Sequence, residues 1–306
     1  MTTTHPRAAH ARTAESSAPP TPARGAATIV RREILTRTGN RTILTATLAL
    51  AAIAGLGAGI GGWFLVDATR EAGTVVLDTR ILFATAMISA LLAAMVYSSS
   101  SLASGVVEEK SSRIVEILLT KIGVAPLLAG KMIGVGLVTL AQLLVIGGAV
   151  VGGFSVVGGW SVLEIELGPS LVWFLVWFLQ GYVLFALLST LLASTVSRQE
   201  DLGTAAMPLS VVQMALLIIA LYVVPANLDE AWVHALSFVP LFSSYLMPMR
   251  FGLDSVGTPE MVIAAVVAAI TVPLLFRLVV RIYRNNALRT GSRVSLRASL
   301  KAADAS

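Results

Sequence analysis

The sequence predicts an all-α integral membrane protein with six transmembrane helices, and its composition and charge pattern both lead to this prediction. Hydrophobic residues make up 56% of the 306 residues and charged residues only 13%, whereas a soluble domain carries about 25% charged residues. The mean hydropathy is +0.83. Long stretches without Asp, Glu, Lys or Arg recur at lengths that cross the ~30 Å hydrocarbon core of a bilayer. These features exclude a soluble enzyme and a disordered chain.

Six uncharged runs define the expected spans. Helices are the open-ended structures that satisfy their own backbone hydrogen bonds in lipid. The last run contains Arg277 and Arg281 near its end, and these side chains can extend to the membrane interface. The expected spans lie near residues 43–66, 81–107, 132–157, 171–196, 203–226 and 261–283.

A further stretch, residues 231–249, also lacks Asp, Glu, Lys and Arg. It contains Pro240 and Pro248, and proline removes a helical hydrogen bond and restricts the residue before it. We therefore expect short re-entrant or interfacial segments here, and the sequence leaves the choice between the two open.

Basic residues are distributed unevenly between the two sides of these spans. With six spans, 19 of the 22 Lys and Arg residues fall on the side of both termini and three on the other side. Positively charged loops remain in the cytoplasm. We therefore expect a multi-pass protein of the cell membrane with both termini cytoplasmic. The net charge of +5 is a topology signal and does not require nucleic acid as a partner.

The chain is expected to contain one transmembrane domain, residues 29–283, between two tails. Residues 1–28 are rich in Ala, Thr, Ser, Pro and Arg, which predicts a disordered cytoplasmic tail. Residues 284–306 form a basic cytoplasmic tail. Residues 29–42 place apolar and basic side chains on different faces, which predicts an amphipathic elbow helix along the inner leaflet; a plain charged flank to the first span is the alternative.

Residues 106–121 carry a ladder of charges at helical spacing. Glu109, Arg113 and Glu116 recur at i, i+4 and i+7 and so share one face of a helix. Such a helix can lie at the inner membrane surface with its charges toward a cytosolic partner. A solvated face that merely ends the second span is an equally good interpretation of the pattern alone.

Residues 106–134, VVEEKSSRIVEILLTKIGVAPLLAGKMIG, resemble the signature of ABC-2 type exporter permeases, nearest to the sodium-extrusion (NatB-like) branch. In that family an EEK-x-x-R-x-x-E segment forms the cytoplasmic coupling helix, and a P-x-x-L-x-x-GK turn follows. Residues 238–254 and, more weakly, 281–301 resemble later parts of the same branch. The coupling-helix residues implied by this resemblance are Glu108, Glu109, Lys110, Arg113 and Glu116.

The resemblance implies a transport subunit rather than an enzyme. A separate ABC ATPase would bind ATP and Mg²⁺, so no cofactor is expected in this chain, and a second permease, identical or different, would complete the pathway. The sequence itself contains no G-x-x-x-x-G-K-[ST] phosphate loop, because Gly130 and Lys131 follow Ala125 where the upstream glycine is required. The assembled complex would hydrolyse ATP.

The cargo is less well defined than the architecture. NatB-like permeases usually carry a large extracytoplasmic insertion between the first two spans, and here residues 67–80 alone connect them. The uncharged runs hold no carboxylate that could replace the water around a cation. We therefore expect an amphiphilic or drug-like compound, with sodium as the less favoured possibility.

Two other function classes were weighed. Glu108, Glu109 and Arg113 also fit the EExxxR motif of CPBP-type intramembrane proteases, but the three histidines lie in the N-terminal tail and on the far side of the membrane, so no catalytic constellation assembles. No catalytic or metal-binding residues are expected. An ATP-independent secondary transporter is the remaining alternative. An Asp or Glu embedded in a span would favour it, and the six uncharged runs contain none.

Polar and small residues within the spans are candidates for the pathway or for helix packing. Gly55/Gly59, Gly57/Gly61 and Gly148/Gly152 have the four-residue spacing that allows close approach of helices. Three glutamines lie at mid-span and either line a pathway or hydrogen-bond between helices, and we favour the second role; they are Gln142, Gln180 and Gln213.

Overall fold

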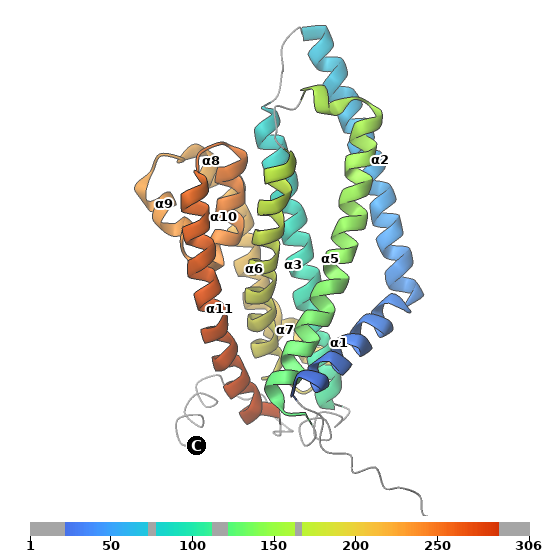
Figure 1. The fold of residues 1–306 in the computed structure, drawn as a ribbon, viewed down its shortest axis with the longest axis vertical. Helices are drawn as coiled ribbons and strands as arrows, with labels where there is room; N and C mark the ends of the chain where they lie inside the picture. The colour runs from blue at the N-terminus through green and yellow to red at the C-terminus, as the bar shows by residue number, and fades with distance from the viewer. Residues whose placement is uncertain (1–21, 73–77, 112–121, 163–166, 288–306) are drawn as a thin grey trace, which may run out of the picture.

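The computed structural model describes residues 22–72, 78–111, 122–162 and 167–287, and this part of the chain is helical almost throughout (Figure 1). Six of its helices are long and apolar enough to cross a membrane, which confirms the predicted class. The spans are helices α2 (Arg41–Ala72), α3 (Thr79–Ser111), α5 (Val124–Val156), α6 (Leu167–Ala193), α7 (Gln199–Ile218) and α11 (Thr258–Ala287).

The fifth span contains an irregular turn near its end. A π-helical turn, η2 (Ile219–Val223), and the short helix α8 (Val224–Ala226) continue α7 without a break, so that the whole span runs over Gln199–Ala226. A 3-10 turn, η1 (Gly159–Val162), follows α5. All six spans begin and end within a few residues of the uncharged runs, except that α5 begins eight residues before the predicted 132.

Helix α1 (Pro22–Thr38) precedes the first span and crosses the start of α5 at an angle (Figure 1). The prediction of disorder up to residue 28 is wrong for residues 22–28, which are helical. They are ordered because α1 packs closely on α5: a Cβ added to Gly130 would lie 2.8 Å from the Ala26 carbonyl oxygen and 2.9 Å from Ile29 Cβ. Composition alone misses this contact. Residues 1–21 and 288–306 lie outside the described part.

The stretch between the last two spans forms two short helices, α9 (Ala231–Ser237) and α10 (Pro240–Gly252). The prediction that it is not a seventh span is confirmed. Pro240 occupies the first turn of α10, where its missing N–H is tolerated. Every residue from Ser243 to Arg250 is buried, and α10 packs beside α3 and α6 in the half of the bundle away from α1 (Figure 1).

Helix α6 is the centre of a tightly packed body. It contacts α3, α10 and α11, and its Trp177, Phe178 and Phe185 are buried with exposed fractions of 2% or less. The Phe185 ring meets the Tyr245 ring of α10 edge to face, with centroids 6.0 Å apart. Large aromatic side chains therefore fill the space between these helices.

Helices α2 and α5 form a parallel pair beside this body (Figure 1). Their backbones almost touch: a Cβ added to Gly153 would lie 2.0 Å from the Gly55 carbonyl oxygen. The predicted close approach at Gly55 and Gly59 is confirmed, whereas a Cβ added to Gly148 or Gly152 would meet nothing within 4 Å. Within the described chain, Gly153 of α5 therefore packs on α2, whereas Gly148 and Gly152 do not contribute to packing.

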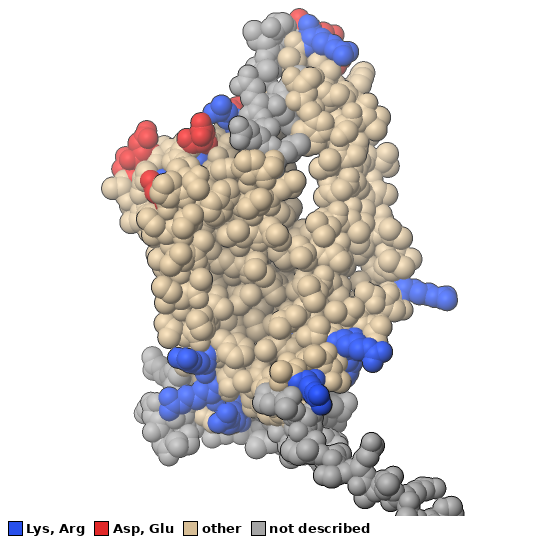
Figure 2. Space-filling view, in the orientation of Figure 1, with Lys and Arg blue, Asp and Glu red and all other residues tan. Residues whose placement is uncertain are grey.

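The two ends of the bundle differ in charge. On the face shown in Figure 2, most Lys and Arg side chains gather at the end that carries α1, and the acidic side chains lie at the opposite end with a few basic ones. The start of α1 and the end of α11 both lie at the basic end (Figure 1). This basic end contains the described part of the segment that the sequence singled out.

Candidate functional site at the basic end of the bundle

The last turn of α3 carries Glu108, Glu109 and Lys110, which the sequence assigned to a single coupling helix. Successive side chains on a helix point about 100° apart, and here they face three different surroundings. Glu109 and Lys110 are buried, with exposed fractions of 7% and 5%, whereas Glu108 is exposed. Arg113 and Glu116 lie outside the described residues, so the ladder that joins them to Glu109 stays a prediction.

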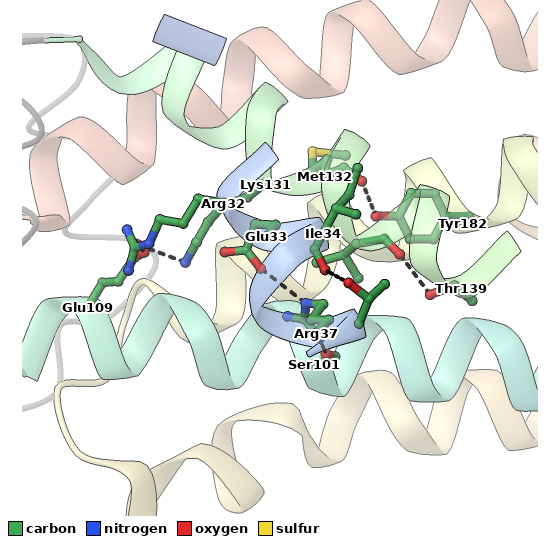
Figure 3. Close-up of polar contacts among 12 residues, drawn as sticks. Arg32, Glu33, Ile34, Arg37, Ser101, Glu109, Lys131, Met132, Thr139 and Tyr182 are labelled. Carbon is green, nitrogen blue, oxygen red and sulfur yellow. Dashed lines mark hydrogen bonds and ion pairs between the residues drawn. The ribbon is translucent and has the colours of Figure 1, made fainter. Parts of the chain in front are cut away.

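Glu109 forms a buried ion pair that joins three helices (Figure 3). Its Oε2 atom lies 2.7 Å from Lys131 Nζ on α5, and its Oε1 atom lies 3.7 Å from Arg32 Nη1 on α1. The lysine fits because Gly105 has no side chain: a Cβ there would lie 3.3 Å from Nζ. In low dielectric such a pair is strong while both partners are present and costly once one is removed.

Lys110 anchors the same helix end to a different neighbour. Its Nζ donates to the Ser194 carbonyl oxygen at 2.9 Å. Ser194 directly follows the last residue of α6, where carbonyl groups lack intrahelical partners and attract cations. Asn286 of α11 donates from Nδ2 to Ser194 Oγ at 3.3 Å. The end of α3 is thus tied to both α6 and α11.

Helix α1 adds an inward-facing ion pair of its own. Arg37 Nε lies 3.0 Å from Glu33 Oε2, and Arg37 Nη1 also donates to Ser101 Oγ on α3 (Figure 3). Glu33 comes close to α5 because Gly134 leaves room for it: a Cβ there would lie 2.6 Å from Glu33 Cβ. Gly130 and Gly134 together form the surface on which α1 rests.

These contacts lie at the ends of the two helices that flank residues 112–121 in the sequence, and those residues lie outside the described part. Glu109 and Lys110 come just before them, and Lys131 lies two turns into the helix that follows. The buried ion pair holds these two helix ends together. Within the described ranges, no three His, Asp or Glu side chains gather closely enough to hold a metal ion.

The three mid-span glutamines take different positions. Gln142 donates from Nε2 to Thr47 Oγ1 at 2.8 Å and joins α5 to α2. Gln180 donates from Nε2 to the Pro240 carbonyl oxygen at 3.2 Å and to Ser243 Oγ at 2.5 Å, which joins α6 to α10. Gln213 is 2% exposed, and its Nε2 has no hydrogen-bond partner in the described part of the chain.

One polar cluster was missed by the sequence analysis. Arg250 is fully buried, and its Nη2 lies 3.1 Å from Glu260 Oε2, 2.9 Å from His234 Nδ1 and 3.2 Å from the Ser255 carbonyl oxygen. It ties together α9, α10 and α11 at the end away from α1. The signal was an arginine within an otherwise apolar stretch, which the charge count treated only as a loop residue.

Comparison with known proteins places this arrangement in a family. The sequence model described as "ABC-2 family transporter protein" matches residues 78–281, a range that includes the ends of α3 and α5 and the segment between them. Two curated proteins are similar to this chain. "Uncharacterized protein YhaP" of Bacillus subtilis (strain 168) is 28% identical over 227 residues, which cover 69% of this chain and 52% of the relative.

The second relative extends the likeness beyond the bacterial protein. "Uncharacterized protein MJ1024" of Methanocaldococcus jannaschii (strain ATCC 43067 / DSM 2661 / JAL-1 / JCM 10045 / NBRC 100440) is 23% identical over 206 residues, which cover 66% of this chain and 49% of the relative. The chain spans about half the length of the curated relatives it matches. The family match covers most of the chain, with six helices able to span a membrane, and the chain therefore belongs to the ABC-2 transporter family.

Proposed function

We propose that this chain is the permease subunit of an ATP-driven exporter and that a separate ATPase moves it through the segment 112–121. Membership of the family implies a membrane transport subunit that works with an ABC ATPase. The partner ATPase binds ATP and Mg²⁺ and resides in the cytoplasm. A second permease, identical to this chain or not, completes the pathway.

One observation carries this proposal: the buried pair of Glu109 and Lys131 joins the two helices on either side of that segment at 2.7 Å. A force applied to a loose loop would be absorbed by the loop. A force applied here reaches α3 and α5 together, and Arg32 extends the connection to α1 at 3.7 Å. Coupling of this kind requires a two-state element that the force can bias, and the α2–α5 pair beside the packed body suits that role.

The orientation of the chain follows from its charge. The end of the bundle where the basic side chains gather (Figure 2) carries the start of α1 and the end of α11 (Figure 1), and basic segments remain in the cytoplasm. We therefore assign both termini and the ATPase contact to the cytoplasmic side of the cell membrane. Arg250 and Glu260 then lie on the outer side.

For the cargo we favour an amphiphilic compound over sodium, although the resemblance is nearest to the NatB-like branch. Glu109 is the carboxylate that lies buried at the basic end in the described part of the chain. It is paired with Lys131 and is therefore not available to coordinate a bare cation. The 14-residue link between the first two uncharged runs is also unlike that branch. Hydroxyl and amide groups suit an amphiphile better than a dehydrated ion.

The proposal is tested by transport in inside-out vesicles that contain the chain and its co-purified ATPase. ATP, but neither a non-hydrolysable analogue nor a proton gradient alone, should drive accumulation of an amphiphilic dye. Accumulation driven by the gradient without ATP would identify an ATP-independent secondary transporter instead. ATP-dependent sodium uptake without any effect of dyes or lipids would overturn the choice of cargo.

A further inference from the structure

A polar groove runs along one face of α3 at the basic end, beside the Glu33–Arg37 ion pair of α1. Tyr97, Ser100, Ser104 and Glu108 recur every three or four residues, so they share one face of the helix. Together with Arg37 of α1 they line a cavity of about 530 Å³. Tyr97 is 40% exposed, and Ser100 and Glu108 are exposed as well.

Among the described residues, the groove has one carboxylate without an ion-pair partner, that of Glu108. Arg37 on its rim is neutralised by Glu33 at 3.0 Å. Glu108 forms no ion pair within the described ranges, because the neighbouring cations turn elsewhere: Lys110 to the Ser194 carbonyl oxygen at 2.9 Å and Lys131 to Glu109 at 2.7 Å. The Glu108 carboxylate thus remains the charge that a ligand in this groove would meet.

The dimensions of the groove suit an elongated small molecule. Glu108 lies 11 positions after Tyr97, which is about 16 Å along a helix at 1.5 Å per residue. The groove therefore runs from the basic end of α3 toward the middle of this span, and its volume lies in the ~300–1,000 Å³ range of drug-sized ligand sites. Its lining offers hydroxyl groups, a carboxylate at one end and an aromatic ring at the other.

We propose that this groove binds a lipophilic cation, with the positive charge next to Glu108 and the apolar body along α3 toward Tyr97. A carboxylate at the edge of a low-dielectric region attracts a cation more strongly than it would in water, and the Tyr97 ring at the other end gives the apolar body an aromatic surface to pack on. The inference rests on the proposed exporter function, since it makes the groove the cytoplasmic-side entry site for the cargo. It gives Glu108 a ligand-binding role in place of the coupling role that the resemblance implies.

The charge preference can be tested with tetraphenylphosphonium and tetraphenylborate, which have nearly the same shape and opposite charges. The chain contains no cysteine, so Ser104→Cys introduces a single reactive thiol in the groove. Tetraphenylphosphonium should slow its reaction with N-ethylmaleimide at least fivefold, and tetraphenylborate should not. Thr204→Cys on α7 is the control, because Thr204 is also exposed but does not line the groove; neither ion should protect it.

Direct binding of tetraphenylphosphonium to the purified full chain in lipid nanodiscs gives the second measurement. Glu108→Gln should weaken binding about tenfold, and Glu108→Asp should retain most of it. Equal protection by both ions, or unchanged binding to the Glu108→Gln variant, would overturn the proposal. A Ser104→Cys thiol that is unreactive without ligand and crosslinks to a second copy would show that another chain fills the groove, which also overturns it.

These assays need neither the ATPase nor ATP, so they separate the two proposals. Protection by the cation in a chain that drives no ATP-dependent transport would leave the site standing and remove the exporter function. Transport without protection would leave the exporter function standing and remove the site.

Discussion

The packed body around α6 and the α2–α5 pair have nearly the same hydropathy, but their helices pack in different ways. The most apolar stretches of α6 and α2 have hydropathies of 2.1 and 2.0, yet 50% of the first is buried inside the protein and only 11% of the second. In the body, aromatic side chains such as Trp177 and Phe185 fill the space between helices. In the α2–α5 pair, Gly55 and Gly153 bring two backbones into direct contact.

This difference reflects the solvent. Lipid is as apolar as the side chains that face it, so an apolar helix gains little by being covered, and close packing decides which helices associate. In the α2–α5 pair the helices pack through small residues, and most of the surface of the pair is left to lipid. The body achieves contact with large interlocking side chains. The two regions meet at the basic end, where the Glu109 and Lys131 pair joins α3 to α5.

The largest expected loss of stability comes from disrupting the Glu109–Lys131 ion pair at this joint between α3 and α5. Lys131→Met leaves Glu109 buried without its nearest cation, and removing one partner of a buried ion pair destabilises by about 3–5 kcal/mol. The variant should show a lower melting temperature in detergent than the wild type. The double variant Glu109→Leu with Lys131→Met should recover most of the loss, because an apolar pair leaves no uncompensated charge. Unchanged melting of the single variant would show that the pair does not stabilise the joint.

A smaller loss of stability should follow from disrupting the contact between α2 and α5. In Gly153→Ala the new Cβ would lie 2.0 Å from the Gly55 carbonyl oxygen, and a backbone atom cannot move aside as a side chain can. Overpacking typically costs about 1–3 kcal/mol, and we expect the upper part of this range. Gly152→Ala is the matched control, since its Cβ would meet nothing within 4 Å. Thermal stability should fall in the first variant alone.

The same substitution in the body should be tolerated better. In Gly181→Ala the new Cβ would also lie 2.0 Å from its nearest atom, but that atom is the terminal Cε of Met95. Methionine is flexible and fills irregular space, so we expect a loss of about 1 kcal/mol. A loss as large as that of Gly153→Ala, measured in the same melting assay, would contradict the contrast between side-chain and backbone packing.

The smallest effect on stability is expected for Arg113→Ala, which touches neither region's packing in our interpretation. A surface ion pair contributes about 0–1 kcal/mol, so the melting temperature should hardly change. If Arg113 reaches across an interface to the ATPase, loss of one partner costs about 2–5 kcal/mol of binding. Capture of the ATPase and transport should then fail in a folded permease. Full ATPase binding and transport in this variant would remove Arg113 from the coupling role.

The sequence predicts the spans well and their contacts poorly, for physical reasons. Uncharged runs are needed wherever a helix crosses lipid, so their positions are visible along the chain. Glycine spacing does not say which face of a helix meets a partner, and thus Gly55 and Gly59 make the expected contact while Gly148 and Gly152 do not. The helical start of α1 was missed because its order comes from packing on Gly130.

The candidate site was predicted in part. The resemblance identified Glu108, Glu109 and Lys110 and also marked Lys131, but the pairing of Glu109 with Lys131 joins residues 22 positions apart and depends on how α3 and α5 pack. The divergence of three adjacent side chains at the end of α3 follows from helix geometry, once the surrounding helices are known. The resemblance assigned all three to one coupling helix.

The backbone contact between Gly55 and Gly153 has a mechanical consequence. Side-chain contacts can yield by changing rotamers, but two backbones pressed together have no such freedom, so we expect α2 and α5 to tilt together. Phe154 is 23 residues further along α5 than Lys131, which is about 35 Å at 1.5 Å per residue. A tilt of about 3° about the ion pair would move the far end of α5 by about 2 Å.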